Sequence, residues 1–265
     1  SKDTSSAQLP VLDRVSESYK VLCETRLMGE LSARVSPPHP LEMNDADFTP
    51  IPATPSAFDH ANRLFLSALL HFGARAFPEF AELSKDEKWT VVTHFYCRFR
   101  LFETGYRANK RFNDYPDRSF SSHTMYVDDD VARTFYPDDD ANRCMARSLK
   151  RNIPPARARF RRLRLHQEEF LAVATIMFWD VDCMDVSPAV VCKGERYRER
   201  VMSELHTFYR NNLCLDNYAT RVGELLTLPD IYQCVADDMK KVYELLRLLD
   251  VFSDETFVYR VCDRK

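Results

Sequence analysis

The chain has 265 residues, of which 45% are hydrophobic, 29% charged and 12% aromatic. These proportions are typical of a folded globular protein and exclude a disordered or fibrous chain. The formal net charge of −3 excludes a polycation that coats nucleic acid. The longest nearly apolar stretch, Leu171 to Trp179, is far shorter than the roughly 20 residues that cross a membrane. No secretory signal is visible, and the first residue is Ser1 instead of Met, which suggests a segment of a longer protein.

Cysteine and histidine spacing excludes the common metal and redox motifs. The eight cysteines are scattered without a Cys-x-x-Cys pair, and the seven histidines never pair at metal-ligand spacing. We therefore expect reduced, buried thiols in an intracellular protein, and no metal or cofactor in this segment. Neither a Gly-x-Ser-x-Gly elbow nor a His-Glu-x-x-His motif nor a glycine-rich phosphate loop occurs, so we do not expect an enzyme.

The first part of the chain has the pattern of two helices separated by a proline-rich loop. Apolar residues at helical spacing predict a helix over 11–28. Six prolines mark a loop over 33–55, and a second apolar stripe predicts a helix over 57–76. Pro78 sets the end of that helix, because the residue before a proline is disfavoured in the α conformation.

The next predicted helix is apolar on more than one face. Ser84 and Glu87 have the spacing of a capping box, which begins a helix that runs to about residue 109. Its large apolar residues are Trp89, Val91, Val92, Phe95, Tyr96, Phe99, Leu101, Phe102 and Tyr106. A helix that is apolar nearly all round belongs in the middle of a protein, so we expect it to be the core.

The rest of the chain is also mainly helical. Residues 119–127 alternate and are rich in β formers, which predicts one short β-hairpin. Helices are predicted over 128–136, 139–151, 165–179, 187–211, 216–250 with an interruption at Pro229, and 254–262 with a Ser253 cap, and a basic connection follows residue 151. The sum is ten to twelve helices and one hairpin in a single all-α domain over residues 1–265.

Two segments resemble signature motifs of the ligand-binding domain of nuclear hormone receptors. Residues 77–88 (Phe-Pro-Glu-Phe-Ala-Glu-Leu-Ser-Lys-Asp-Glu-Lys) are similar to the signature between helix 3 and helices 4 and 5, with Glu87-Lys88 where Asp-Gln is usual. Residues 221–229 are similar to the motif of helix 10, and residues 168–180 to helix 8. Further likenesses to the nematode branch related to hepatocyte nuclear factor receptors lie at Lys88-Trp89, Phe178-Trp179-Asp180 and Glu204-Leu205-His206-x-Phe208-Tyr209.

The resemblance implies a three-layer helical sandwich and a regulatory role. The chain would be the ligand-binding domain of a ligand-regulated or orphan nuclear receptor that acts as a transcription factor in the nucleus. Its DNA-binding domain would lie upstream, outside this chain, and would carry the only zinc and the only contact with DNA. No contact with a membrane is expected.

The resemblance also implies an apolar cavity for a lipid-like, for instance fatty-acid-like, ligand. Arg107 stands where several receptors place the helix 5 arginine that holds a ligand carboxylate or hydroxyl. A guanidinium suits that task because it stays charged and pairs in two-pronged fashion. The alternatives for Arg107 are a structural ion pair or a position in solvent. The residues implied to line the cavity, which are equally consistent with plain core, are Phe65, Leu69, Phe99 and Phe102.

A co-regulator groove is the second implied site. Receptors of this family grip a Leu-x-x-Leu-Leu helix between a basic residue of helix 3 and a Glu of the last helix, which cap the two ends of the peptide. Arg75 takes the basic position and Lys88 lies in the same groove, whereas the last helix, Phe257-Val258-Tyr259-Arg260-Val261, has Arg260 where Glu is usual. Arginine accepts no hydrogen bond, so this clamp is broken. Either activation is weak, or the partner differs, or the helix packs shut with Arg260 in solvent.

Two further surfaces are left open by the sequence. Helix 10 implies a homodimer or heterodimer surface through Arg221, Leu225 and Leu226, although both leucines are equally consistent with core. The stretch from Arg143 to Arg164 holds nine Arg or Lys and no acid. It is either a contact for phosphate or an acidic partner, or a solvated helix face.

Two other functions are consistent with the same residues. One is a helical protein that binds or sequesters lipid without transcriptional output. The other is a ligand-free helical scaffold for protein interactions. Recruitment of a co-regulator peptide separates the receptor from the carrier, and bound lipid separates the carrier from the scaffold.

Overall fold

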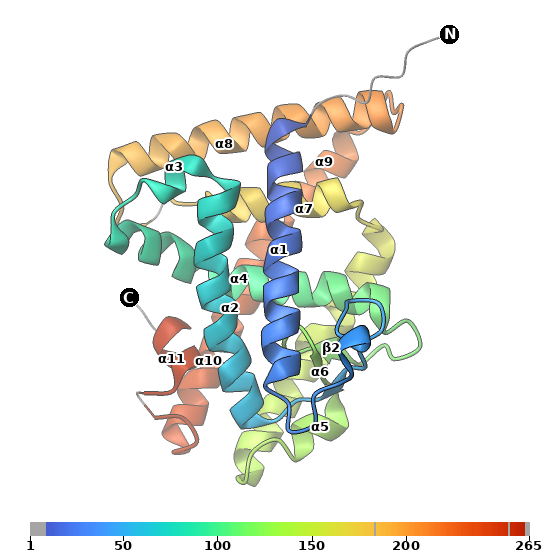
Figure 1. Ribbon diagram of the computed structural model, residues 1–265, viewed down its shortest axis with the longest axis vertical. Helices are drawn as coiled ribbons and strands as arrows, with labels where there is room; N and C mark the ends of the chain where they lie inside the picture. Colours follow the sequence, from blue (N-terminus) through green and yellow to red (C-terminus); the bar gives the residue numbers. More distant parts are fainter. Residues whose placement is uncertain (1–8, 183, 254, 263–265) are drawn as a thin grey trace. The chain divides into compact units, whose positions relative to one another are not determined.

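The computed structural model describes residues 9–182, 184–253 and 255–262, and helices make up most of this part (Figure 1). The α-helices are α1 (Pro10–Ser32), α2 (Pro55–Ala76), α3 (Pro78–Ala81), α4 (Lys85–Arg111), α5 (Asp129–Arg133), α6 (Asp139–Leu163), α7 (Gln167–Phe178), α8 (Pro188–Thr207), α9 (Ala219–Leu226), α10 (Leu228–Leu248) and α11 (Phe257–Cys262). A 3₁₀ turn spans Pro40–Glu42 and a π-helical turn spans Phe208–Asn212. The predicted all-α class is confirmed.

The described residues group into two compact units. The first unit holds residues 9–21, 70–95 and 165–231, and the second holds residues 22–69, 96–164 and 232–262. Helices α1, α2 and α4 each contribute residues to both units. The interpretation of 1–265 as a single domain stays a prediction.

The small sheet is larger than the predicted hairpin. Strands β2 (Ser119–Phe120) and β3 (Met125–Val127) pair antiparallel, which confirms the hairpin. A third strand, β1 (Ile51–Pro52), pairs parallel with β3, so the strand order is β1-β3-β2. The prediction of a hairpin alone was therefore incomplete. Strand β1 has only two residues within the proline-rich loop, too few for an alternating pattern to reveal it.

Helix α4 is buried on several faces, as its composition predicts. The capping box is confirmed: the Ser84 and Glu87 amides each donate to the side chain of the other residue, at 3.2 Å. Residues with no exposed surface are Val91, Val92, Phe95, Tyr96, Phe99 and Phe102. The charged side chain of Glu103 has no exposed surface either, so this helix also carries charge into the interior.

Helix α6 continues where a basic connection was predicted. It runs unbroken past two prolines from Pro154, because its far half keeps one face buried through Arg157 and Phe160. The Arg157 guanidinium donates to the carbonyl oxygens of Ala108 and Phe112 at the end of α4. Such carbonyls form the negative end of a helix and favour a cation there. This tertiary contact outweighs the local preference of proline to end a helix.

The last helix starts later than predicted. Helix α11 begins at Phe257, and the predicted first residue, Asp254, lies outside the described residues. The Ser253 amide donates to the Thr256 hydroxyl at 3.0 Å, and the Thr256 carbonyl accepts from the Arg260 amide at 3.0 Å. Thr256 therefore precedes the first turn in place of Ser253, because hydroxyl side chains that bind nearby backbone groups compete with helix formation.

A buried ion pair joins α7 to α9 in the first unit. Glu169 of α7 has no exposed surface, and its carboxylate accepts hydrogen bonds from the Arg221 guanidinium and, at 2.7 Å, from the Tyr209 hydroxyl. Burial alone would raise the pKa of Glu169, but the hydrogen bonds from Arg221 and Tyr209 outweigh it and hold the pKa below its usual range. The ionised carboxylate is therefore the form that the fold stabilises.

The substitution Glu169→Gln should lower the free energy of unfolding at pH 7 by about 3 kcal/mol, because it removes the negative charge of a buried ion pair. The depressed pKa means that this contribution is present above pH 4.5 and is lost as the pH falls below that value. The difference between wild type and variant in urea unfolding should therefore shrink in acid. Glu168→Gln, one residue away and outside the ion pair, is the matched control. A deficit that is constant from pH 7 to pH 3 would contradict the assignment.

Candidate functional site

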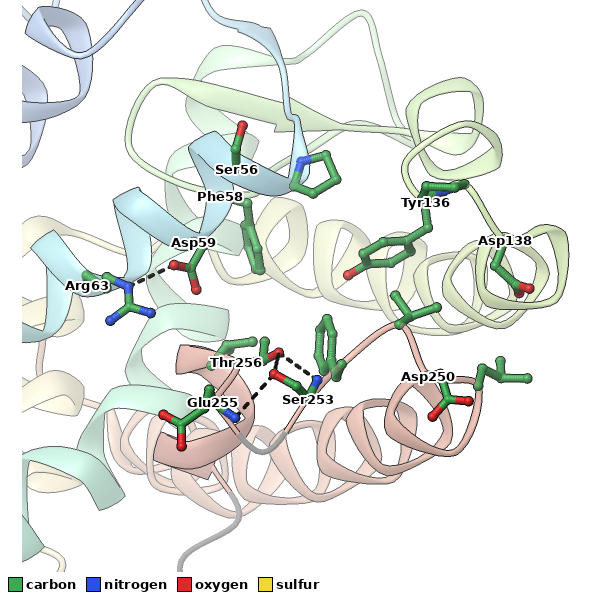
Figure 2. Close-up of a pocket in the computed structure, with 16 residues that line it drawn as sticks. Ser56, Phe58, Asp59, Arg63, Tyr136, Asp138, Asp250, Ser253, Glu255 and Thr256 are labelled. Atoms are coloured by element: carbon green, nitrogen blue, oxygen red, sulfur yellow. Dashed lines mark hydrogen bonds and ion pairs between the residues drawn. The ribbon is translucent and has the colours of Figure 1, made fainter.

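A cavity of about 710 Å³ lies in the second unit (Figure 2). Its walls come from the first turns of α2, from the turn between α5 and α6, and from the connection between α10 and α11. The lining residues are Pro55, Ser56, Phe58, Asp59, Arg63, Tyr136, Pro137, Asp138, Leu249, Asp250, Val251, Phe252, Ser253, Glu255, Thr256 and Val258. A volume of this size suits a small organic ligand.

Aromatic side chains form the apolar part of the cavity. Figure 2 shows the rings of Phe58 and Tyr136 pointing into the space between α2 and the α10–α11 connection. Tyr136 and Phe252 pack edge to face, with ring centroids 6.0 Å apart. Burial raises the pKa of the Tyr136 hydroxyl above its usual range, so the hydroxyl stays neutral at pH 7. The cavity thus offers apolar walls and neutral hydrogen-bonding groups, the Tyr136 hydroxyl among them.

The charged groups of the cavity are mostly acidic. Among the described residues that line it, the acids are Asp59, Asp138, Asp250 and Glu255, and the one cation is Arg63. Arg63 already pairs with Asp59 at 2.8 Å, and Asp138 caps the first turn of α6 through the Ala141 amide at 2.7 Å. The net negative charge of the lining would therefore repel an anionic ligand group, but it would not repel a neutral polar group.

The cavity is in direct contact with α11. Val258 of α11 lines it and is 2% exposed. The Arg63 guanidinium lies 4.8 Å from the centroid of the Phe257 ring, within range of a cation–π contact with the first residue of α11. Glu255, another lining residue, pairs with Arg260 at 3.0 Å. A molecule in the cavity would touch side chains that hold α11.

Arg107 lies in a second polar site, next to the small sheet. Its side chain is 11% exposed and donates to the His123 carbonyl at 3.0 Å. It also lies 3.7 Å from the Glu103 carboxylate and 3.6 Å from Asp45. Arg26 contacts the same Glu103 carboxylate at 3.1 Å. Of the alternatives that the sequence left open, Arg107 is thus found in a buried ion-pair network and not in solvent.

The ionisation states in this network follow from burial and charge. Burial would raise the pKa of Glu103, but Arg26 and Arg107 outweigh it and lower the pKa below its usual range. Burial, helped by the charge of Arg107, lowers the pKa of His123 to about 4. Glu103 is therefore ionised and His123 neutral at pH 7.

The apolar residues implied to line a cavity lie in the packed interior. Phe65, Leu69, Phe99 and Phe102 are at most 2% exposed, and none of them lines the cavity of Figure 2. The Phe65 ring covers the Arg26 guanidinium at 3.7 Å, and the Phe102 ring packs 5.3 Å from Tyr232. Within the described part of the chain, these four residues therefore make the contacts of core residues. Their role in ligand binding stays a prediction.

The implied co-regulator residues are divided between the two units. Arg75, at the end of α2, and Lys88, in α4, belong to the first unit. Arg75 is exposed, whereas the Lys88 ammonium donates to the Ala81 carbonyl at 2.7 Å. In the second unit Val258 and Val261 are buried, Phe257 is half-buried, and Arg260 is 59% exposed.

The implied dimer residues differ in exposure. Arg221 holds Glu169, Leu225 is 1% exposed, and Leu226 is 43% exposed. Leu226 is therefore the one of the three whose side chain is substantially free to meet a partner. In the basic stretch Arg157 is buried, while Arg143, Arg147 and Lys150 are exposed.

The sequence did not reveal the cavity in Figure 2, and of its lining residues only Val258 was assigned to a site, the co-regulator groove. Asp59 and Arg63 are four residues apart on a predicted helix, so their pairing was the one local signal available. Phe58, Tyr136 and Phe252 come from three distant segments, and no spacing rule joins them. Among the described residues no helix is both long and apolar enough to cross a membrane.

Comparison with known proteins identifies the family. Residues 55–249 match the family described as the ligand-binding domain of nuclear hormone receptor. The nuclear hormone receptor family member nhr-16 of Caenorhabditis elegans is 23% identical over 264 residues, which cover 93% of this chain and 65% of that protein. The member nhr-86 of the same organism is 25% identical over 201 residues, which cover 71% of this chain and 48% of that protein. The chain therefore spans between 48% and 65% of the length of these two relatives.

A solved structure shows the same fold. The Ultraspiracle ligand binding domain from Drosophila melanogaster is similar with a TM-score of 0.64 and 15% identity, over 96% of this chain and 98% of that one. At this identity the likeness shows the fold alone, which is the all-α sandwich of such domains. The nematode relatives agree with the branch that the sequence motifs predict. The chain therefore belongs to the nuclear hormone receptor family and contains its ligand-binding domain.

Proposed function

We propose that this domain regulates a nuclear transcription factor by binding a small lipid-like molecule in the cavity of Figure 2. The observation that carries the proposal is the composition of the cavity wall, which includes Val258 of α11 and the segment that leads to it. Occupancy would favour one packing of α11 over another, because a ligand shifts an equilibrium toward the state that it binds better. DNA would be contacted through a module outside this chain, and no catalytic role is proposed.

The polar end of the ligand follows from the charge of the cavity. In the described part of the chain the lining has four acids and one arginine, and that arginine already pairs with Asp59. A neutral head such as a hydroxyl avoids repulsion and has Tyr136 as a hydrogen-bonding partner. A fatty-acid carboxylate would be better matched to Arg107, which lies in the network of the small sheet. A ligand with a hydroxyl and a ligand with a carboxylate are therefore worth comparing.

Co-regulator binding at α11 would meet a cation where the family usually has Glu. Arg260 is exposed and accepts no hydrogen bond from the first turn of a bound helix. We propose that the wild-type domain binds a Leu-x-x-Leu-Leu helix weakly and favours a partner with acidic residues. A dimer would form through α9, where Leu226 is exposed.

The purified domain should be stabilised by long-chain alcohols more than by fatty acids of the same length. At 100 times its dissociation constant a ligand adds about 2.7 kcal/mol, which raises the melting temperature by roughly 5 °C or more. Thermal melting against matched alcohol and acid pairs, together with native mass spectrometry, measures this. A larger shift with the acids would point to Arg107 as the polar anchor.

Val251→Trp should remove that shift, because Val251 lines the cavity and the larger ring occupies it. Leu248→Trp is the matched control, since Leu248 is 78% exposed and does not line the cavity. If both variants respond to the lipid as the wild type does, the ligand does not bind in this cavity. If no lipid shifts even the wild type, the helical scaffold is the better interpretation.

Arg260→Glu should strengthen binding of a Leu-x-x-Leu-Leu peptide by about five- to tenfold. The new carboxylate accepts hydrogen bonds from the first turn of the peptide and interacts favourably with its dipole, an effect of roughly 1 kcal/mol. Fluorescence polarisation of a labelled peptide measures the affinity, with Arg260→Ala as the control that only removes the cation. An equal affinity for the Glu and Ala variants would count against α11 as part of the groove.

A further inference from the structure

Three potential metal ligands meet in the second unit although they are far apart in the sequence. Cys23 of α1, Glu103 of α4 and His123 of the β2–β3 turn each offer an atom within 4.8 Å of the others. Glu103 and His123 have no exposed surface, and Cys23 is half-buried. The three residue types are those that bind Zn²⁺ in proteins. Their separation along the chain explains why no metal-ligand spacing exists in the sequence.

The hydrogen bonds of His123 leave one ring nitrogen able to bind a metal. Its Nε2 lies 3.1 Å from the Asp45 carboxylate, which only accepts, so Nε2 carries the proton. Nδ1 then bears the lone pair, and it is buried without a hydrogen bond among the described residues. A carboxylate on the far nitrogen is the arrangement that orients metal-binding histidines. The Glu30 carboxylate also fixes the His123 backbone by accepting from its amide at 3.0 Å.

Charged groups of both signs surround these three residues. Arg26 and Arg107 contact Glu103, and Glu30 and Asp45 contact His123. Two further arginines face these anions, Arg34 beside Glu30 and Arg111 beside Asp45. Arg26 and Arg107 would compete with a metal for Glu103.

We propose that Cys23, Glu103 and His123 form a Zn²⁺ site that ties α1 and α4 to the β2–β3 turn. On binding, the Cys23 thiol releases its proton to solvent and the sulfur donates to the metal together with one Glu103 oxygen and His123 Nδ1. Water supplies the fourth position, as in three-ligand zinc sites. This inference is independent of the proposed ligand and co-regulator functions.

Cobalt(II) is the probe, because it binds zinc sites and reports thiolate coordination by absorption. Co²⁺ added to the reduced, metal-free domain should produce a sulfur-to-cobalt charge-transfer band and the visible bands of a four-coordinate site, and one equivalent of Zn²⁺ should remove both. Cys23→Ser should lose the charge-transfer band. Cys192→Ser, which changes an exposed cysteine of α8, should keep it.

Asp45→Asn tests the site without touching a ligand. Asp45 is 67% exposed, so the variant should fold normally, which circular dichroism checks. It should weaken Zn²⁺ binding by about tenfold, because the amide orients His123 less well than the carboxylate does. Absence of the cobalt band in the wild type, or its persistence in Cys23→Ser, would overturn the proposal. An unchanged affinity in Asp45→Asn would remove His123 from the ligand set.

Discussion

Helix α4 carries charged side chains into the interior of the second unit, where a charge without a partner costs several kcal/mol. Arg100 is 7% exposed and Glu103 has no exposed surface. Each finds its partner on another element: Arg100 donates to the Tyr243 hydroxyl of α10 at 2.6 Å, and Glu103 pairs with Arg26 of α1. These two contacts hold α1 and α10 against α4 in this unit.

The cavity and α11 share the α10–α11 connection. The α10–α11 connection is one wall of the cavity, and Phe252 in that connection is 8% exposed and packs on both Tyr136 and Tyr243. Tyr243 in turn accepts the hydrogen bond from Arg100. A chain of direct contacts thus runs from the buried charge of α4 to the wall of the cavity. In the proposed regulation, a ligand in the cavity would act on α11 through these contacts.

Local sequence signals predicted most helices, whereas tertiary contacts determined the length of α6, the surroundings of Arg107 and the cavity. The Ser84–Glu87 capping box and the apolar faces of α4 are local, so both were predictable. The continuation of α6 past Pro154 depends on Arg157 and its contacts with α4, which no local rule contains. The family resemblance put Arg107 at a polar site, and the sequence could show its i−4 neighbour Glu103. It could not show His123 or Asp45, which approach from loops. The cavity was missed because its walls come from three segments.

Hydrogen–deuterium exchange over residues 257–261 tests the central claim most directly. The domain would be compared with and without the alcohol that gives the largest thermal shift, with α8 of the first unit as an internal reference. Exchange in α11 should change at least severalfold on binding, while exchange in α8 should not, because the ligand would contact side chains that hold α11. If a ligand stabilises the domain and leaves exchange in α11 unchanged, the cavity does not regulate α11.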